Sequence, residues 1–359
     1  MRTIQIAALA GAVLLLSACG APNPAEPGEP EAGGHFLPAG ITEEDVAAAQ
    51  EEGQVAYYTA SQEKDEQAIT SVFEKEYGIE VIIQRQSSGP TYELIRAEAD
   101  AGQDLFDVVT VCNVALSNQM GVDGVLANLD DLGLHPDADT WLPGSQDENR
   151  FWAYSTVLLP GTICWNNKLV SEADAPKTWE DLLDPKWAGG KIASNTAESG
   201  GSSIETFYSV WKAYGPEYWD DLAAQGLVFY SAGQQTVQAV QTGERPVGIV
   251  ADTAVGFSDP NISMVSPEPV LLAGCPQSVS AEPQHAAAAK LFHAWYTSTE
   301  GQKTVGEVRG AYSARGDVPV PAGRPDVSTL ELLETGGETA DPVFIQNLID
   351  EWITVFQPR

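Results

Sequence analysis

The chain has 359 residues and a formal net charge of −33, because 51 acidic residues stand against 18 basic ones. This length predicts two domains, and the acidic balance argues against nucleic acids or anionic lipid surfaces as partners. It does not argue against an anionic ligand, since a net-acidic protein can bind anions at a local site, and we attribute the acidity to salt tolerance or general solubility.

Residues 1–18 have the pattern of a secretory signal peptide, with Arg2 before an apolar run that is too short to remain as a membrane-spanning helix. Residues 16–19 read LSAC and match the bacterial lipobox, so we expect Cys19 to become the lipid-bearing first residue of the mature chain. The alternative is an ordinary signal peptide followed by an incidental cysteine. Residues 19–40 are rich in Pro, Gly and Glu, which predicts a flexible tether to a membrane surface.

The remaining cysteines, Cys112, Cys164 and Cys275, allow at most one disulfide and leave one thiol over, without indicating which two pair. The four histidines are scattered and no CxxC sequence occurs, so a Cys/His metal site is not expected. No HExxH, GxSxG or Walker A sequence occurs either. We therefore expect no metal, no cofactor and no enzymatic activity.

After the tether, the pattern predicts a helix over 42–53 and then strands and helices in alternation. The predicted strands are 54–61, 79–86 and 106–113, separated by helices over 63–78 and from about Gly89 to Gly102. Strands and helices that alternate at this spacing favour a parallel sheet in an α/β domain.

The middle third of the chain continues the alternation, with further predicted helices and strands over 177–194, 203–215 and 234–252. Residues 266–305 predict extended segments and a helix, and 341–356 predict an amphipathic helix whose apolar stripe we assign to core packing. The extended stretches 151–165 and 267–275 are explained if the chain crosses more than once between two α/β lobes. Ligands of such folds bind in the interdomain crevice, where loops at strand ends converge.

Five segments together resemble a known family: residues 55–109, 161–170, 175–194, 242–252 and 286–302. Their order and spacing are similar to those of extracellular solute-binding proteins of ABC importers, specifically the ferric-ion-binding-protein group of the type II periplasmic binding fold. The resemblance covers most of residues 52–315. It implies a two-lobed α/β receptor with a hinge, which closes on a small-molecule ligand in the interlobe cleft and is read by ABC permease subunits.

On this basis we expect a signal peptide at 1–18, a tether at 19–40, a first lobe of 41–156 with 268–320, a second lobe of 157–267, and a C-terminal helical segment, 321–359, packing on the lobes. We expect a monomer that is not an enzyme. It would lie outside the cytoplasm, anchored through the lipid on Cys19, on a Gram-positive outer face or in a periplasm.

The family's usual iron ligands are absent. Ferric-ion binders of this group hold the metal with two adjacent tyrosines of the second lobe, and the aligned positions here are Thr253 and Ala254. The family's histidine and acidic ligands would fall near Gln62 and near Cys112–Asn113. The one adjacent tyrosine pair, Tyr57–Tyr58, belongs to a strand in which the two side chains point to opposite faces. The sequence therefore does not predict iron binding by that ligand set.

Two Ser/Gly-rich helix starts suggest an anion site instead. Ser87, Ser88 and Gly89 open the first-lobe helix, while Ser199, Gly200, Gly201 and Ser202 precede a second-lobe helix. The resemblance implies that these two helix starts face each other across the cleft. Free N–H groups and positive potential at helix starts suit phosphate, phosphonate or carboxylate groups. The alternative for each serine is that it only caps its helix.

Other residues are expected to complete the site. Ser61 and Asn113 end strands and would donate to the ligand, and Asp252 would either accept from a ligand ammonium or cap the next turn. Trp152, Tyr154 and Trp165 would either wall the pocket or belong to the aromatic core. The leading hypothesis is a receptor for a small organic anion or zwitterion, such as a phosphonate, phosphate ester or carboxylate. The alternatives are a ferric-ion or ferric-chelate receptor and, from another class, a secreted enzyme on the same fold.

Overall fold

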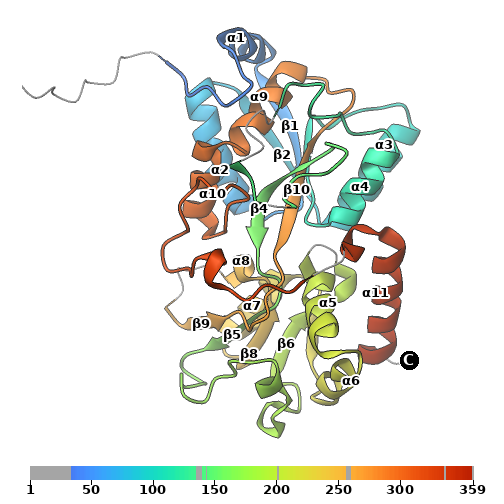
Figure 1. The fold of residues 1–359 in the computed structure, drawn as a ribbon, viewed down its shortest axis with the longest axis vertical. Coiled ribbons are helices and arrows are strands. Elements are labelled where there is room, and N and C mark those ends of the chain that lie inside the picture. The colour runs from blue at the N-terminus through green and yellow to red at the C-terminus, as the bar shows by residue number, and fades with distance from the viewer. Residues whose placement is uncertain are drawn as a thin grey trace, which may run out of the picture. The chain divides into compact units, whose positions relative to one another are not determined.

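The first lobe is built around a mixed five-stranded sheet (Figure 1). The computed structural model describes residues 34–134, 140–142, 144–199, 202–255, 260–334 and 337–357, so the predictions for the signal peptide, Cys19, Gly200 and Gly201 lie outside the described residues. The strand order is β2 (Glu80–Arg85), β1 (Gln54–Thr59), β3 (Val108–Thr110), β10 (Ala273–Val279), β4 (Ala153–Leu158). The three N-terminal strands are parallel to one another, and β10 runs antiparallel to its neighbours β3 and β4.

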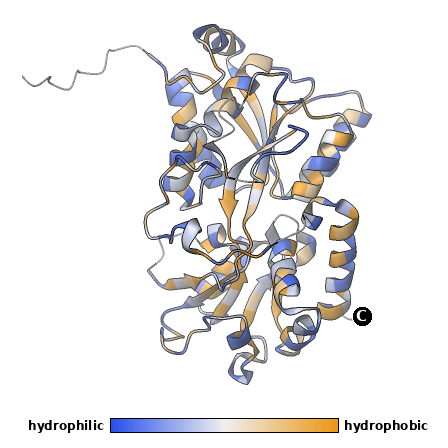
Figure 2. Ribbon diagram, in the orientation of Figure 1, coloured by the Kyte–Doolittle hydropathy of each residue, from blue (hydrophilic) through white to orange (hydrophobic). Residues whose placement is uncertain are grey.

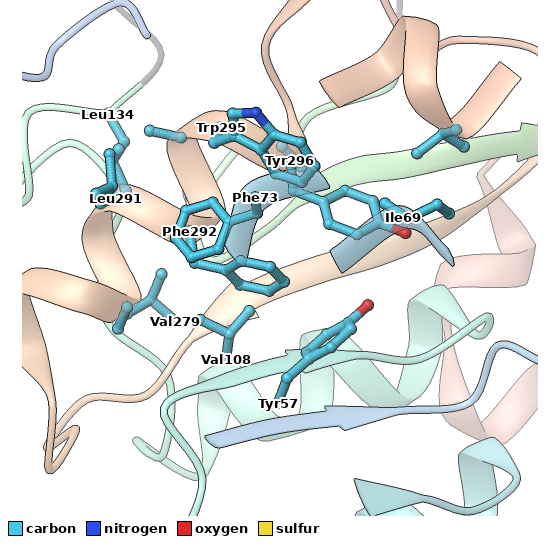
Figure 3. Close-up of a cluster of buried hydrophobic side chains, with 14 of the residues drawn as sticks. Tyr57, Ile69, Phe73, Val108, Leu134, Val279, Leu291, Phe292, Trp295 and Tyr296 are labelled. Atoms are coloured by element: carbon cyan, nitrogen blue, oxygen red, sulfur yellow. The ribbon is translucent and has the colours of Figure 1, made fainter. Parts of the chain in front are cut away.

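Among the described residues, six α-helices accompany this sheet: α1 (Glu43–Glu52), α2 (Glu63–Tyr77), α3 (Ser88–Asp100), α4 (Val114–Val122), α9 (Ala286–Tyr296) and α10 (Thr299–Arg309). The first two end as the sequence predicts, because Gly53 and Gly78 adopt a left-handed φ of 73° that other residues rarely take. The core under α2 and α9 is aromatic, and Phe292 packs against both Tyr57 and Phe73 (Figure 3).

The second lobe has its own five-stranded sheet, in the order β7 (Val228–Tyr230), β6 (Ile192–Asn195), β8 (Val247–Val250), β5 (Thr162–Asn166), β9 (Ile262–Val265). Its α-helices are α5 (Ser202–Tyr214), α6 (Glu217–Ala224), α7 (Gly233–Gln241) and the short α8 (Asp252–Val255). Short 3-10 helices cover Glu180–Leu183, Pro185–Trp187 and Ala197–Ser199. Hydrophobic residues follow the strands of both sheets, whereas the helices carry hydrophobic and hydrophilic residues side by side (Figure 2).

The chain passes between the sheets in the two extended stretches that the sequence singled out. It leaves β4 through residues 159–161 to enter β5, and it returns from β9 to β10 through residues 266–272. The expected lobe boundary between residues 156 and 157 falls inside β4, so the change of sheet comes after Leu158. Strand β4 continues to that point because its residues pair with β10.

The C-terminal segment runs over both lobes (Figure 1). Two 3-10 helices, Val327–Thr329 and Glu338–Ala340, precede α11 (Pro342–Phe356), which packs against α5 and α6 of the second lobe and also contacts α4 of the first. Ile345, Leu348 and Trp352 of α11 are buried in one hydrophobic cluster with residues of α5. No helix in the described residues is both long and apolar enough to span a bilayer.

Candidate functional site

A cavity of about 430 Å³ lies between the two lobes, where strand ends and helix starts of both converge. The first lobe contributes Ala60, Ser61, Gln62, Asp65, Arg85, Ser87, Ser88, Cys112, Thr156, Leu158, Cys275 and Arg309 to its wall. The second lobe contributes Asn195, Ser202, Ser203, Ser231, Ala232, Gly233, Gln234, Gln235, Ala251, Thr253 and Ala254. We call this space the cleft cavity. Its wall is made mainly of hydroxyl, amide and small side chains.

Three helices, α3, α5 and α7, start on this wall. In α3 and α7 the residues before the first turn, Ser87 and Ala232, make no side-chain cap to their helix, so the first N–H groups keep their hydrogen-bonding capacity. Neither helix has an acidic residue in its first turn that would offset the positive end of its dipole. These helix starts are therefore suited to an anionic ligand.

Helix α5 does carry an acidic residue in its first turn, Glu205, but this side chain is buried. Desolvation raises the pKa of Glu205 to about 8, so its carboxyl group is mostly protonated at neutral pH. Its Oε2 atom has no hydrogen-bond partner among the described residues. The start of α5 therefore carries little negative charge. Ser202 and Ser203, in the first turn of α5, line the cavity.

The predicted serines of α3 are in the cavity wall, but in different ways. Ser87 is partly exposed and does not cap α3. Ser88 is buried, and its Oγ accepts a hydrogen bond of 3.1 Å from the Cys112 N–H. Its own hydroxyl proton has no acceptor in the part of the chain that the structure describes, so Ser88 can still donate to a ligand.

Two arginines lie on the wall, and sequence reasoning identified neither. Arg85, at the end of β2, donates its Nε to the Ser61 carbonyl at 3.2 Å and forms no ion pair with a described carboxylate. Arg309, at the end of α10, is buried, with Nη1 3.1 Å from Thr156 Oγ1 and Nη2 2.7 Å from Glu66 Oε1. Arg85 therefore supplies a positive charge that no described carboxylate pairs with, whereas the charge of Arg309 is balanced by Glu66, which lies behind the wall.

Asp65 is the one carboxylate side chain on the described wall of the cleft cavity. Burial raises the pKa of this carboxyl group, an effect that the positive charge of Arg309 opposes. Because Glu66 balances the charge of Arg309, the charged side chains that remain on the described wall are Arg85 and Asp65, and the three helix starts add positive potential. The wall is therefore much less acidic than the protein as a whole.

The structure places two other predicted ligand contacts away from the wall. Asn113 caps α4, because its Oδ1 accepts from the Leu116 N–H at 3.0 Å. Gly89 belongs to the first turn of α3 and does not line the cavity. Of the second Ser/Gly-rich start, Ser202 lines it, and Ser199 ends a short 3-10 helix.

Asp252 is also not a wall residue, and it is fully buried. Its carboxylate accepts from the Leu159 N–H at 2.9 Å and the Thr253 N–H at 2.7 Å, and it pairs with Arg324 of the C-terminal segment. Because this carboxylate is fully buried outside the cavity wall and is already paired with Arg324, it is not placed to receive a ligand ammonium group, and the zwitterion hypothesis cannot rest on Asp252. The ion pair instead joins the start of α8 to the C-terminal segment, and the hydrogen bond from Leu159 links the same carboxylate to the first crossover.

The three aromatic candidates belong to packed interiors and not to the pocket wall. Trp152 stacks on Tyr154 with ring centroids 5.0 Å apart and donates its indole N–H to Asn118 Oδ1 at 2.8 Å. Trp165 is buried in the second-lobe core, with the Lys177 ammonium 3.8 Å from its ring centroid. None of the three contributes to the cleft cavity. Of the two alternatives for these residues, pocket wall or aromatic core, the structure therefore favours the aromatic core.

A disulfide joins Cys112 to Cys275 across 163 positions of the chain, and both residues lie on the cavity wall. It ties the loop after β3 to β10, the strand through which the chain re-enters the first lobe. Cys164 is the remaining described thiol, and burial raises its pKa to about 12, so it is chemically inert. The sequence limited the chain to one such bridge but did not indicate the partners.

One further signal was available in the sequence. Residues 231–235 read SAGQQ and open α7, which is a third small-residue helix start at the cavity. The arginines gave no such signal, because a lone basic residue at a strand or helix end is usually solvated. Their position on the wall follows only from the packing of α10 and β2.

The positions expected for the iron-binding tyrosines, Thr253 and Ala254, do line the cleft cavity. The described wall holds neither a tyrosine nor a histidine. Within the described residues there is also no group of three or more His, Cys, Asp and Glu side chains that could hold a metal ion. The donors present suit an oxyanion better than a hard cation.

Comparison with solved structures shows the same fold. The chain resembles iron-bound HitA from Pseudomonas aeruginosa with 20% identity and a TM-score of 0.71, over 84% of this chain and 99% of that one. It resembles the periplasmic binding protein AfuA from Actinobacillus pleuropneumoniae, solved with exogenous fructose-6-phosphate bound, with 19% identity and a TM-score of 0.74, over 86% and 100% of the two chains. It also resembles an ABC-transporter substrate-binding protein from Agrobacterium tumefaciens with 18% identity and a TM-score of 0.72, over 89% and 97%. The expected two-lobed type II periplasmic binding fold is thereby confirmed.

A search of curated protein sequences found no match. The family described as bacterial extracellular solute-binding protein matches residues 68–329, which is well over half of the chain. The chain therefore belongs to this family and is an extracytoplasmic solute-binding receptor of an ABC transporter.

Proposed function

We propose that this receptor captures a small organic anion, such as a phosphate ester, phosphonate or carboxylate, by closing its lobes on it. The observation that carries the proposal is the convergence of the α3, α5 and α7 starts, together with Arg85, on a cavity whose described wall holds a single carboxylate. Both lobes contribute donors, so a ligand held by both favours the closed state. Closure is then a two-state equilibrium that the ligand shifts through its additional contacts.

The absence of phenolate ligands on the described wall supports this proposal over binding of a bare ferric ion. The fructose-6-phosphate of AfuA belongs to the chemical class that we propose here, and the iron of HitA does not. Among the described residues, the wall also offers one carboxylate without a histidine beside it, which is not the acid–base pair that a hydrolytic enzyme needs. If the ligand carries a cationic group, Asp65 is the carboxylate that can receive it.

The binding test is a thermal-shift and calorimetric screen with inorganic phosphate, methylphosphonate, citrate, fructose 6-phosphate and ferric citrate. A hydrogen bond to a charged group contributes about 1.5–3 kcal/mol, so the double variant Ser88→Ala/Ser202→Ala should weaken anion binding by roughly 100-fold or more. Ser71→Ala is the matched control, because Ser71 is exposed on α2 and does not line the cavity. Stabilisation by anions that persists at full size in the double variant would show that the site is wrong.

Arg85 gives a second, independent test. Arg85→Ala should weaken binding of the same anion by about 10-fold or more and flatten its dependence on ionic strength, because one positive charge is lost from the wall. Arg96→Ala, an exposed change on α3 outside the cavity, is the control. If Arg85→Ala and Arg96→Ala bind the anion with equal affinity, Arg85 does not contact the ligand.

We further propose that the mature chain is a monomer tethered through a lipid on Cys19. The LSAC sequence and the Pro/Gly/Glu-rich residues after it support the anchor. Cells that express the full chain should incorporate labelled palmitate into it, and Cys19→Ala should abolish the incorporation. Labelling that survives this change would contradict the anchor.

A further inference from the structure

The Cys112–Cys275 disulfide lies directly against the candidate anion site. Both cysteines line the cleft cavity, where Cys112 is half-buried and Cys275 is buried. The Cys112 N–H donates to Ser88 Oγ at 3.1 Å, and Ser88 opens α3 on the same wall. A single hydrogen bond therefore connects the bridged residue to a hydroxyl group of the proposed ligand site.

The direction of this hydrogen bond decides what the Ser88 hydroxyl group can do. A serine hydroxyl has one proton to donate and two lone pairs, and the Cys112 N–H occupies one of these lone pairs. The O–H bond must therefore be directed away from Cys112. Since the proton has no acceptor among the described residues and Ser88 lines the cleft cavity, a bound anion can supply that acceptor.

The bridge lies just beyond the end of a sheet pairing. The paired residues of β3 and β10 end with Thr110 opposite Gln277. Cys112 and Cys275 lie two positions further along the same antiparallel register. The disulfide therefore continues, as a covalent link, the connection between the two segments after the strand pairing has stopped.

The backbone around the bridge is irregular. The Val111 N–H donates to the Pro276 carbonyl at 3.1 Å, whereas the next N–H along the chain, that of Cys112, is directed to Ser88. Strand β10 changes its register with β4 between Gly274 and Pro276. Because regular pairing does not hold the chain here, the disulfide is the link that fixes the Cys112 backbone relative to β10.

We propose that the Cys112–Cys275 disulfide is a positioning element of the ligand site, which holds the Cys112 N–H on Ser88 Oγ and so directs the Ser88 hydroxyl proton to the bound anion. The affinity of the receptor then depends on whether the bridge is closed. This inference rests on the proposed function and adds a redox dependence to it. Because both cysteines line the cavity, a small dithiol can reach the bridge.

Dithiothreitol supplies the two electrons that opening of the bridge requires. One of its thiolates attacks a sulfur atom of the disulfide, the S–S bond breaks, and the displaced cysteine takes up a proton. The second thiol of the reagent then attacks the mixed disulfide, so that the reagent leaves as its cyclic disulfide and both cysteines become thiols. The Cys112 backbone is then no longer tied to β10, and the Ser88 hydroxyl group loses its fixed direction.

The test compares the anion affinities of the oxidised and the reduced protein by isothermal titration calorimetry. The probe is whichever of inorganic phosphate, methylphosphonate, citrate and fructose 6-phosphate binds the oxidised protein most tightly. Reduction should weaken its binding about 10-fold or more, which is the loss expected for one hydrogen bond to a charged group. In Ser88→Ala the hydroxyl group is absent, so reduction should change the affinity by less than about twofold. Ser71→Ala, the exposed control on α2, should lose as much affinity on reduction as the wild type.

The reduction potential of the bridge gives a second readout. An anion that binds the oxidised form tenfold more tightly than the reduced form must lower this potential by about 30 mV at saturation. The potential is measured in dithiothreitol redox buffers by alkylation of the free thiols. The shift should occur in the wild type and in Ser71→Ala, and it should be absent from Ser88→Ala.

If the reduced chain loses its circular-dichroism spectrum, the rate at which dithiothreitol opens the bridge of the folded, oxidised protein replaces the affinity. Saturating anion should slow this opening several times more in the wild type than in Ser88→Ala, since only the wild type loses its contact with the anion. Any slowing because the anion blocks the reagent is common to both proteins and cancels in this comparison.

The outcomes separate the two proposals. If an anion binds and reduction leaves its affinity unchanged, the positioning role is wrong and the proposed anion receptor stands. The same conclusion follows if reduction has equal effects on the wild type and Ser88→Ala, because the effect then comes from the hydrophobic cluster that Cys275 shares with Leu158 and Ala251. If none of the four anions binds the oxidised protein, the proposed function fails and this inference fails with it.

Discussion

Glu66 behind the cavity wall gives the sharpest test of how the site is supported. It is fully buried in α2 and accepts from Tyr57 Oη at 3.1 Å, Thr59 Oγ1 at 3.1 Å and Tyr296 Oη at 3.0 Å, in addition to its ion pair with Arg309 at 2.7 Å. Glu66→Leu removes the acceptor of all of them at once. We predict that it destabilises the protein severely, although Glu66 does not itself line the cavity.

The loss in unfolding free energy can be worked out from the buried groups that lose Glu66 as a partner. A buried Arg309 without its carboxylate costs about 3–5 kcal/mol. Tyr296 loses the partner of its hydroxyl group, which adds about 1–3 kcal/mol, whereas Tyr57 keeps a hydrogen bond of 2.8 Å to Thr110. The total, about 4–8 kcal/mol, is comparable to the entire stability of a typical domain. Glu66→Gln should cost less, because it retains one acceptor oxygen.

The assay is a double-mutant cycle by urea unfolding, followed by circular dichroism and by tryptophan fluorescence. In Glu66→Leu/Arg309→Leu no buried charge is left unpaired, so the double variant should recover about 3 kcal/mol or more relative to Glu66→Leu. A coupling free energy below about 1 kcal/mol would refute the reasoning, since it would mean that water or another group already compensates Arg309.

Two further predictions concern other buried groups. The pKa of Glu205 is about 8 in the folded chain against 4.5 in the unfolded one, so the folded state binds the extra proton between these pH values and stability falls as pH rises from about 5 to 8. Glu205→Gln should remove that fall in urea-unfolding free energy, and an unchanged pH slope would contradict the assignment. Opening the Cys112–Cys275 bridge releases a loop of 163 positions, so Cys112→Ala/Cys275→Ala should lower stability by about 2–5 kcal/mol. Dithiothreitol should lower the melting temperature of the wild type but not of this variant, and an equal effect on both would contradict the prediction.

The order of elements could be read from local pattern alone. Period-2 and period-3.6 hydrophobicity, with glycines such as Gly53 and Gly78 at helix ends, predicted the alternating strands and helices of the first lobe. These signals lie within ten or twenty neighbouring residues, so they need no knowledge of the tertiary structure. The same locality made the starts of α3 and α5 visible as candidate anion sites, and Ser87, Ser88 and Ser202 do line the cleft cavity.

What the sequence could not decide depends on residues far apart in the chain. The sequence left Asp252 as a candidate ligand group because it could not show that Arg324, 72 positions away, is its partner. Only the path of the C-terminal segment brings the two side chains together. Cys112 and Cys275 likewise become partners through the antiparallel pairing of β10 with β3. Arg309 reaches the cavity because α10 packs on α2, where Glu66 compensates its charge. Local chemistry thus determined the fold class and half of the candidate anion site, whereas charge compensation and covalent pairing were decided by the tertiary structure, because each requires segments that meet only after folding.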